Sequence, residues 1–220
     1  MRYFPLYMDT RDKKVLVCGG GRSAQLKIEG LLSSEFHFYC IAETFSPAIT
    51  ALQKKYPERI SLKARHLDED FVFFAYDYVI VATDDHAVNA ALIRRAKCLS
   101  VPVLSTENRE DSDFRLAYRI EHGPLSVSVS CQNPTISRKI GEALRPHIEQ
   151  FDAEKLSLLN RIRACMRRKG QKNISEVMED LWTNESIQAR KFLEEIDETT
   201  PGHKGQPIGA HTSTEHSEDL

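Results

Sequence analysis

The chain has 220 residues, of which 41% are hydrophobic and 28% are charged, and its formal net charge is −2. These values are typical of a globular protein with one large or two small domains, and they exclude a strongly basic nucleic-acid binder. No apolar run is long enough to predict a membrane span, and the start lacks a signal-peptide core. Five scattered cysteines without a CxxC pair indicate reduced thiols. We therefore expect a cytoplasmic protein that binds neither nucleic acid nor membranes.

The first predicted element is a short apolar strand over 15–18, followed by the pattern Gly-x-Gly-x-x-Ala and a helix over 22–32. Gly19 would permit a tight turn, and Gly21, which lacks a Cβ atom, would let a pyrophosphate come close. Ala24 is small enough for the helix to lie against the strand. A plain glycine-rich turn is the alternative, but the strand before and the helix after favour a dinucleotide site.

The next elements alternate between strand-like and helix-like segments. We predict strands over 36–41, 59–63, 78–82 and 101–104, and helices over 47–55 and 87–98. Such alternation indicates βαβ units and therefore an α/β fold with a Rossmann-type, doubly wound parallel sheet. Ligands of such sheets bind beyond the carboxyl ends of the strands, where the glycine turn also lies.

Glu43 and Thr44 follow the second predicted strand, close to the offset at which an acidic residue binds the ribose hydroxyls of a dinucleotide. No Arg or Lys lies between Phe36 and Gln53 that could pair with a 2′-phosphate. This favours NAD over NADP as the cofactor. The alternative is that Glu43 simply faces solvent.

Polar residues also follow the fourth and fifth predicted strands. Thr83 and Asp84 lie at the ligand-binding edge, although Asp84 or Asp85 would also suit the N-cap of the next helix. Glu107 comes after the fifth strand and is a candidate general base or ligand-contacting acid. Its alternative is a solvated loop glutamate.

The pattern changes after about residue 113. Strand-like segments over 114–121 and 125–131 flank His122-Gly123-Pro124, which predicts an antiparallel hairpin. Asn133 and Pro134 then begin a helix that runs to about residue 150. A hairpin and one helix bury little surface by themselves, so we expect this region to pair with a second copy in a homodimer.

Further helices are predicted over 153–169, 174–182 and 186–196. The remaining residues are polar and lack an apolar period, which is typical of disorder. The predicted parts are a Rossmann domain over 1–112, a dimerisation region over 113–150, a helical domain over 151–198 and a disordered tail over 199–220.

Arginines gather after the predicted Rossmann domain. Arg115, Arg119 and Arg138 lie in the hairpin region and the helix that follows it. Because guanidinium groups bind carboxylates in bidentate pairs, these residues are candidates for binding a small polyanionic substrate. The alternative is a solvated face. The histidines fit no close metal-binding spacing, so the sequence predicts no particular metal site.

Taken together and in order, these segments resemble the precorrin-2 dehydrogenase family, the N-terminal module of siroheme synthase. The resemblance covers about residues 2–150. The motifs that carry it are Tyr3-Phe4-Pro5-Leu6-Tyr7-Met8-Asp9, Gly19-Gly20-Gly21 with Ala24 and Lys27, Ala82-Thr83-Asp84-Asp85 with Val88-Asn89, and Asp113-Phe114 and Gly123-Pro124-Leu125 before a Ser-Val-Ser strand.

The resemblance implies an intertwined homodimer that oxidises precorrin-2, a tetrapyrrole with many carboxylate arms, to sirohydrochlorin with NAD as hydride acceptor. It also implies that Arg22 and Ser23, together with Glu43 and Thr44, contact NAD. Some members additionally insert ferrous iron, so a bifunctional dehydrogenase and ferrochelatase is an alternative. A non-catalytic regulator that binds NAD or the tetrapyrrole is another.

The sequence departs from the family pattern in two places. Residues 104–107 read Leu-Ser-Thr-Glu where members usually have Asn-Val-Val-Asp, so Glu107 replaces an aspartate implicated in dehydrogenation and chelation. The loop over 131–133 lacks the usual paired glycines. Both changes bear on chelation more than on hydride transfer, which depends mainly on positioning the reactants.

Overall fold

The computed structural model describes residues 3–131 and 133–198. These residues belong to two compact units, of which the first ends at Leu116 and the second begins at Ala117. The predicted tail over 199–220 lies outside the described residues.

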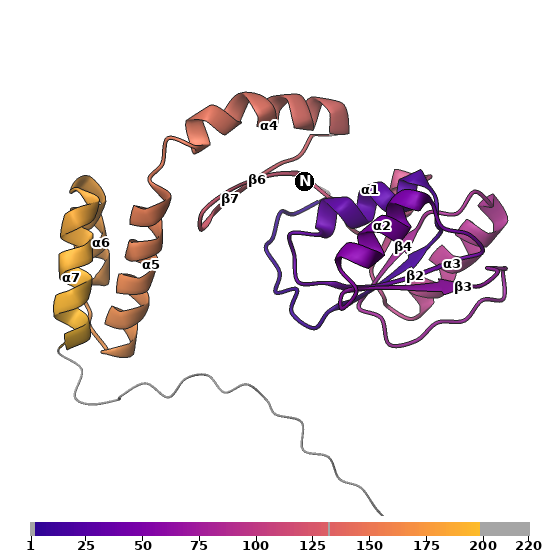
Figure 1. Ribbon diagram of the computed structural model, residues 1–220, viewed down its shortest axis with the longest axis horizontal. Helices are drawn as coiled ribbons and strands as arrows, with labels where there is room; N and C mark the ends of the chain where they lie inside the picture. Colours follow the sequence, from indigo (N-terminus) through magenta and orange to yellow (C-terminus); the bar gives the residue numbers. More distant parts are fainter. Residues whose placement is uncertain (1–2, 132, 199–220) are drawn as a thin grey trace, which may run out of the picture. The chain divides into compact units, whose positions relative to one another are not determined.

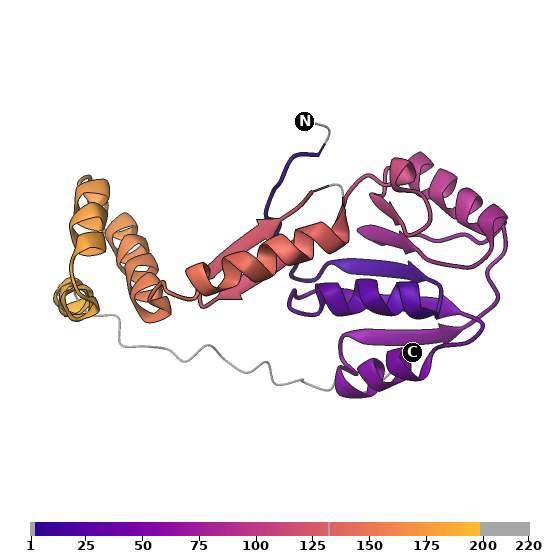
Figure 2. The same cartoon turned by 90° about the horizontal axis from the view of Figure 1, so that it is seen from above.

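The first unit is a five-stranded sheet in the order β3-β2-β1-β4-β5, and every neighbouring pair is parallel. Figure 2 shows its strands running side by side. The elements of this unit are β1 (Lys14–Cys18), α1 (Arg22–Leu31), β2 (His37–Ala42), α2 (Pro47–Lys55), β3 (Ile60–Ala64), β4 (Tyr78–Val81), α3 (His86–Cys98), β5 (Val103–Ser105) and the short 3₁₀ helix η1 (Arg109–Asp111). The predicted Rossmann-type sheet is confirmed.

Helices cover both faces of this sheet. The side chains of a strand alternate between the faces, so each strand can pack against helices on both sides. Val15 and Val17 of β1 are buried with residues of α1 and α2, which lie on one side of the sheet in Figure 1. Leu16 and Cys18 are buried on the opposite face with α3 and Phe71. The central strand is therefore apolar on both sides, as its continuous hydrophobic run indicates.

Two strands begin two or more residues later than the sequence predicts. β5 begins only at Val103, because Pro102 before it has no N–H group to donate to a ladder. The predicted strand over 114–121 begins only at Tyr118. Phe114 instead belongs to the first unit, where its ring contacts Tyr78 edge-on at 5.7 Å. An apolar residue can contribute to a core without belonging to a strand.

The second unit begins with the antiparallel hairpin of β6 (Tyr118–His122) and β7 (Leu125–Val129), followed by α4 (Pro134–Ile148). The Asn133 side chain accepts hydrogen bonds from two backbone N–H groups of the first turn of α4, as predicted for an N-cap. A Cβ atom on Gly141 would lie 2.1 Å from the Tyr118 ring. Gly141 therefore allows the aromatic ring to lie directly on the helix.

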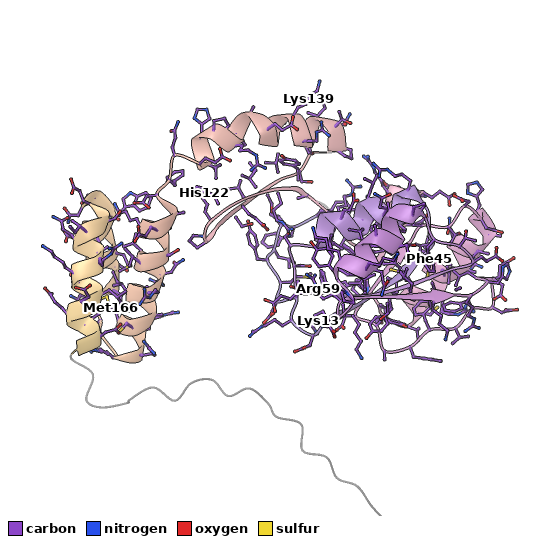
Figure 3. All side chains as sticks on the ribbon, in the orientation of Figure 1. Lys13, Phe45, Arg59, His122, Lys139 and Met166 are labelled. Atoms are coloured by element: carbon purple, nitrogen blue, oxygen red, sulfur yellow. The ribbon has the colours of Figure 1, made fainter. Side chains whose placement is uncertain are left out.

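Helices α5 (Ala153–Arg168), α6 (Ile174–Thr183) and α7 (Ser186–Glu198) follow. They share one buried cluster, in which Ile162 and Met166 are almost completely enclosed. Figure 3 labels Met166 among these helices. The three predicted helices are confirmed, with bounds that differ by no more than two residues.

Candidate functional site

The glycine turn between β1 and α1 is tightly enclosed on one side and open on the other. Gly19 has φ +124°, and a Cβ atom on it would lie 2.2 Å from the carbonyl oxygen of Ala82. A Cβ atom on Gly20 would lie 1.9 Å from the carbonyl oxygen of Thr44. Around Gly21, no heavy atom of the described residues lies within 4 Å of such a Cβ position, its chain neighbours aside. The turn therefore fits between β2 and β4 and leaves space beside Gly21.

Helix α1 presents its first turn at that open side. Among the described residues no side chain caps this helix end, and its first turn contains no acidic residue. The first backbone N–H groups of a helix have no partner within it and attract anions. Arg22 and Ser23 are exposed there, whereas Ala24 is fully buried against the sheet, as the sequence predicts. The open space beside Gly21 and the uncapped helix start together form a cradle in which an anionic group can bind.

At the end of β2, Glu43 contacts a residue that follows the neighbouring strand β3. The Nδ1 atom of His66, which follows β3, lies 2.5 Å from Oε1 of Glu43. Both side chains are largely exposed. The sequence interpretation missed His66, because its contact with Glu43 arises from the parallel pairing of β2 with β3. Glu43 therefore remains accessible to solvent while its orientation is constrained.

At the ends of β4 and β5, a buried amide connects three segments. Asn89 of α3 is only 3% exposed. Its Oδ1 atom accepts from the backbone N–H and the hydroxyl of Thr83, at 3.3 and 2.6 Å. Its Nδ2 atom donates to the carbonyl oxygen of Thr83 at 3.0 Å and to Oε2 of Glu107 at 2.9 Å. All four hydrogen-bonding positions of the amide are therefore used.

The second oxygen of Glu107 contacts a histidine. Nδ1 of His86 lies 2.5 Å from Oε1 of Glu107. The hydrogen bond from Asn89, followed by that from His86, lowers the pKa of the Glu107 carboxyl group from its ordinary value. The Glu107 side chain is 41% exposed, so an ionised carboxylate is accessible at this edge. The sequence interpretation selected Glu107 by position but did not identify His86 and Asn89 as its hydrogen-bonding partners.

The two aspartates after β4 differ in their surroundings. Asp85 is the N-cap of α3 and accepts from the backbone N–H groups of Ala87 and Val88, at 2.8 and 3.0 Å. Capping, one of the two roles predicted for this pair, is therefore carried out by Asp85. Asp84 is exposed beside it and stays a candidate for contact with a ligand.

The three candidate substrate-binding arginines occupy different surroundings. In the first unit, the Arg115 guanidinium lies 4.1 Å from the centre of the Tyr3 ring. Its Nε atom is buried and has no hydrogen-bond partner among the described residues. In the second unit, Arg119 and Arg138 form ion pairs with Glu121 and Glu142, at 2.9 and 3.0 Å.

The cysteines show no feature of a metal or redox centre in the described part of the chain. All five are free, and Cys18 and Cys40 are buried, as expected for small core residues. Burial raises the pKa of each of these two thiols to about 12. Within residues 3–131 and 133–198, no three His, Cys, Asp or Glu side chains form a group that could hold a metal ion. None of the described helices is both long and apolar enough to cross a membrane.

A curated relative and a solved structure both resemble the chain over most of its length. The precorrin-2 dehydrogenase of Priestia megaterium is 24% identical over 203 residues, which cover 88% of the chain and 98% of that relative. A solved structure of SirC, precorrin-2 dehydrogenase, superposes with a TM-score of 0.66 at 22% identity, covering 89% of this chain and 100% of that one. At this identity the superposition establishes a shared fold.

A second group of relatives is longer than the chain. Siroheme synthase 1 of Klebsiella pneumoniae is 30% identical over 146 residues, which cover 66% of the chain but 30% of the relative. The matched region spans between 30% and 44% of the length of the siroheme synthases. A sequence model of the family described as "Putative NAD(P)-binding" matches residues 6–118, just over half of the chain. This match includes the whole parallel sheet and the glycine cradle, and the chain therefore belongs to this NAD(P)-binding family.

Proposed function

We propose that the chain oxidises precorrin-2 to sirohydrochlorin with NAD as the hydride acceptor, a step of siroheme biosynthesis. The observation that carries this proposal is the match to a precorrin-2 dehydrogenase over 98% of that relative's length. The glycine cradle adds independent support, because its open side fits a pyrophosphate. The five free cysteines support a cytoplasmic location for this activity.

The strand order suggests how the cofactor would lie. A dinucleotide bound to this fold spans the carboxyl edge of the sheet, with its pyrophosphate at the β1–α1 turn. We assign the pyrophosphate to Gly19, Gly21, Arg22, Ser23 and Ala24. The adenosine half would lie toward β2, and the nicotinamide half toward β4 and β5.

The side chains beside the adenosine half and those beside the nicotinamide half would then have different tasks. Glu43 would accept hydrogen bonds from ribose hydroxyls, and Thr44 would contact the same half of the cofactor. The Glu43 carboxylate also repels a 2′-phosphate, which favours NAD over NADP. Thr83 and Asp84 would border the nicotinamide half. When bound, the cofactor supplies a hydride acceptor, while the protein positions the reactants.

The substrate carries many carboxylates, and arginine is the residue best suited to bind them. We assign this task to Arg115, Arg119 and Arg138. The Nε–H group of Arg115 is buried and without a hydrogen-bond partner among the described residues, so a substrate acceptor would reach it only after the surrounding side chains move. The ion pairs of Arg119 and Arg138 with neighbouring glutamates would have to open or be shared.

The assembly we propose is a homodimer that pairs through the second unit. Ile136, Ile140 and Leu144 of α4 recur every four residues and are all exposed. This spacing places them on one face of the helix. The adjacent face of the helix, to which Gly141 belongs, lies on the hairpin. An exposed apolar stripe of this kind marks an interaction surface, and a second copy of the same helix region would cover it.

The test uses the purified chain with precorrin-2 and NAD under oxygen-free conditions, and it measures NADH formation and the sirohydrochlorin spectrum. We expect turnover, and we expect Gly21→Asp to abolish it because charge and bulk would occupy the pyrophosphate position. Absence of turnover under conditions in which the Priestia megaterium enzyme works would overturn the proposal. NAD binding by calorimetry without turnover would point to a regulator instead.

A further inference from the structure

We propose that His86 is the catalytic base of this oxidation and that Glu107 is the residue that positions it. The inference rests on the proposed function. Removal of two hydrogens from the macrocycle as a hydride and a proton requires an acceptor for the proton as well as for the hydride. The pair of His86 and Glu107 supplies that acceptor at the expected end of the sheet.

The first step is location. His86 is the first residue of α3, directly after the β4 loop, and Glu107 lies two residues beyond the end of β5. Parallel strands end at the same edge of their sheet, so both residues lie at the carboxyl edge. Because β4 and β5 lie on the side of β1 opposite β2, this corner is the one toward the nicotinamide half.

The second step is orientation. The Asn89 amide is buried, and three of its hydrogen bonds are made with Thr83. These bonds hold its second N–H group toward Oε2 of Glu107. That bond leaves Oε1 to accept from Nδ1 of His86. When a carboxylate oxygen accepts a hydrogen bond from Nδ1–H, it favours the imidazole tautomer that carries its proton on Nδ1. The lone pair of Nε2 is then available for another proton.

The third step is access. The His86 side chain is 83% exposed, and no hydrogen bond to its Nε2 atom involves a described residue. The charged groups on either side of it are Glu107, which holds Nδ1, and Asp85, whose Oδ1 atom caps α3. Asp84 is the next carboxylate along the chain. A substrate that covers this corner would meet an unoccupied nitrogen base.

The fourth step is the chemistry. One C–H bond of the macrocycle breaks, and its hydrogen leaves with the electron pair as a hydride that converts NAD to NADH. The second hydrogen leaves as a proton to Nε2 of His86, and its electrons form a new double bond in the macrocycle. Two electrons and two hydrogens thus leave the substrate, and the imidazolium formed at His86 is stabilised by the Glu107 carboxylate. His86 then returns its proton to solvent.

The other end of the sheet supplies a matched control. His66 contacts Glu43 with the same atoms and the same 2.5 Å separation, but it lies toward the adenosine half. A pair at that end can influence cofactor binding but cannot reach the reacting carbon. Variants at His66 and His86 should therefore change different kinetic constants.

The experiment compares His86→Gln, Glu107→Gln and His66→Gln in the precorrin-2 assay across pH. We expect His86→Gln to lower kcat by about 10²-fold or more without a matching change in KM for NAD. If His86 is the base, kcat of the wild type should fall at low pH, because a protonated imidazole cannot accept a proton. The His86→Gln variant should lack this fall. His66→Gln should instead change KM for NAD and preserve kcat and its pH profile.

A second measurement does not depend on turnover. ¹⁵N NMR of histidine-labelled protein should show neutral His86 with its proton on Nδ1. The Glu107→Gln variant should keep its fold but show a smaller population of this tautomer. If the wild type turns over precorrin-2 but His86→Gln keeps its kcat and pH profile, the base assignment is wrong. A wild type without turnover overturns the proposed function and the base assignment together. An Nε2 tautomer in the wild type overturns the positioning role of Glu107.

Discussion

A Cβ atom on Gly20 would lie 1.9 Å from the carbonyl oxygen of Thr44, whereas one on Gly21 would meet no described heavy atom within 4 Å beyond its chain neighbours. Two adjacent glycines of one turn therefore serve different purposes. Gly20 is required by the approach of the β2–α2 loop to the turn. Gly21 has φ −90°, which any residue can adopt, so its lack of a side chain matters only for what binds beside it.

This difference predicts opposite outcomes for two alanine variants. Gly20→Ala should lower the free energy of unfolding by about 1–3 kcal/mol, because a backbone carbonyl cannot rotate away from the new methyl group. Gly21→Ala should change stability by less than about 0.5 kcal/mol but weaken NAD binding about tenfold or more. Denaturant unfolding and calorimetric titration measure the two effects. If the Gly21→Ala protein binds NAD as tightly as the wild type, the assignment of the pyrophosphate to this turn is wrong.

Glu43 should determine the choice of cofactor. Glu43→Ala removes the acceptor for ribose hydroxyls and the charge that repels a 2′-phosphate. We expect NAD affinity to fall about tenfold and the preference for NAD over NADP to shrink by a similar factor. Glu35→Ala is the matched control, because Glu35 precedes β2 whereas Glu43 follows it. Equal NAD and NADP affinities in the wild type would contradict the assignment.

The exposed apolar stripe of α4 should determine the oligomeric state. Ile140→Lys places a charge in the centre of the stripe, and we expect it to convert a dimer to a monomer in sedimentation velocity experiments. Lys139, labelled in Figure 3, is the next residue back along the helix and is also exposed. Lys139→Gln should leave the dimer intact. A wild-type monomer, or a dimer that tolerates Ile140→Lys, would argue against pairing through α4.

Cys131 should be the more reactive of the two exposed thiols. Its Sγ atom lies 3.2 Å from the Ser137 hydroxyl, and this hydrogen bond lowers the pKa of the thiol. The reactive thiolate therefore forms at lower pH than it otherwise would. We expect Cys131 to be alkylated faster than Cys98 near neutral pH, and Ser137→Ala to move the rate profile of Cys131 toward higher pH. Mass spectrometry of timed iodoacetamide labelling measures both rates.

The sequence predicted those parts of the molecule that depend on residues close together along the chain. The strand, glycine turn and helix around Gly19 are a local pattern, and the alternation of strands and helices predicted the sheet. His66 and His86 were missed, because each contacts its glutamate only through the parallel pairing of strands that are distant in sequence. The strand predicted from Phe114 began four residues too early, because apolar character does not distinguish a residue in a strand from one that fills the core.

The four hydrogen bonds of Asn89 have an evolutionary consequence. Replacing Glu107 alone would leave one N–H group of a buried amide without its acceptor, at a cost of about 1–3 kcal/mol. Replacing Thr83 would remove one of the two donors to the amide oxygen. Selection would therefore act on Thr83, Asn89 and Glu107 jointly, and substitutions at one position should be accompanied by substitutions at the others. Covariation among these three positions would accordingly be a signature of this corner across related sequences.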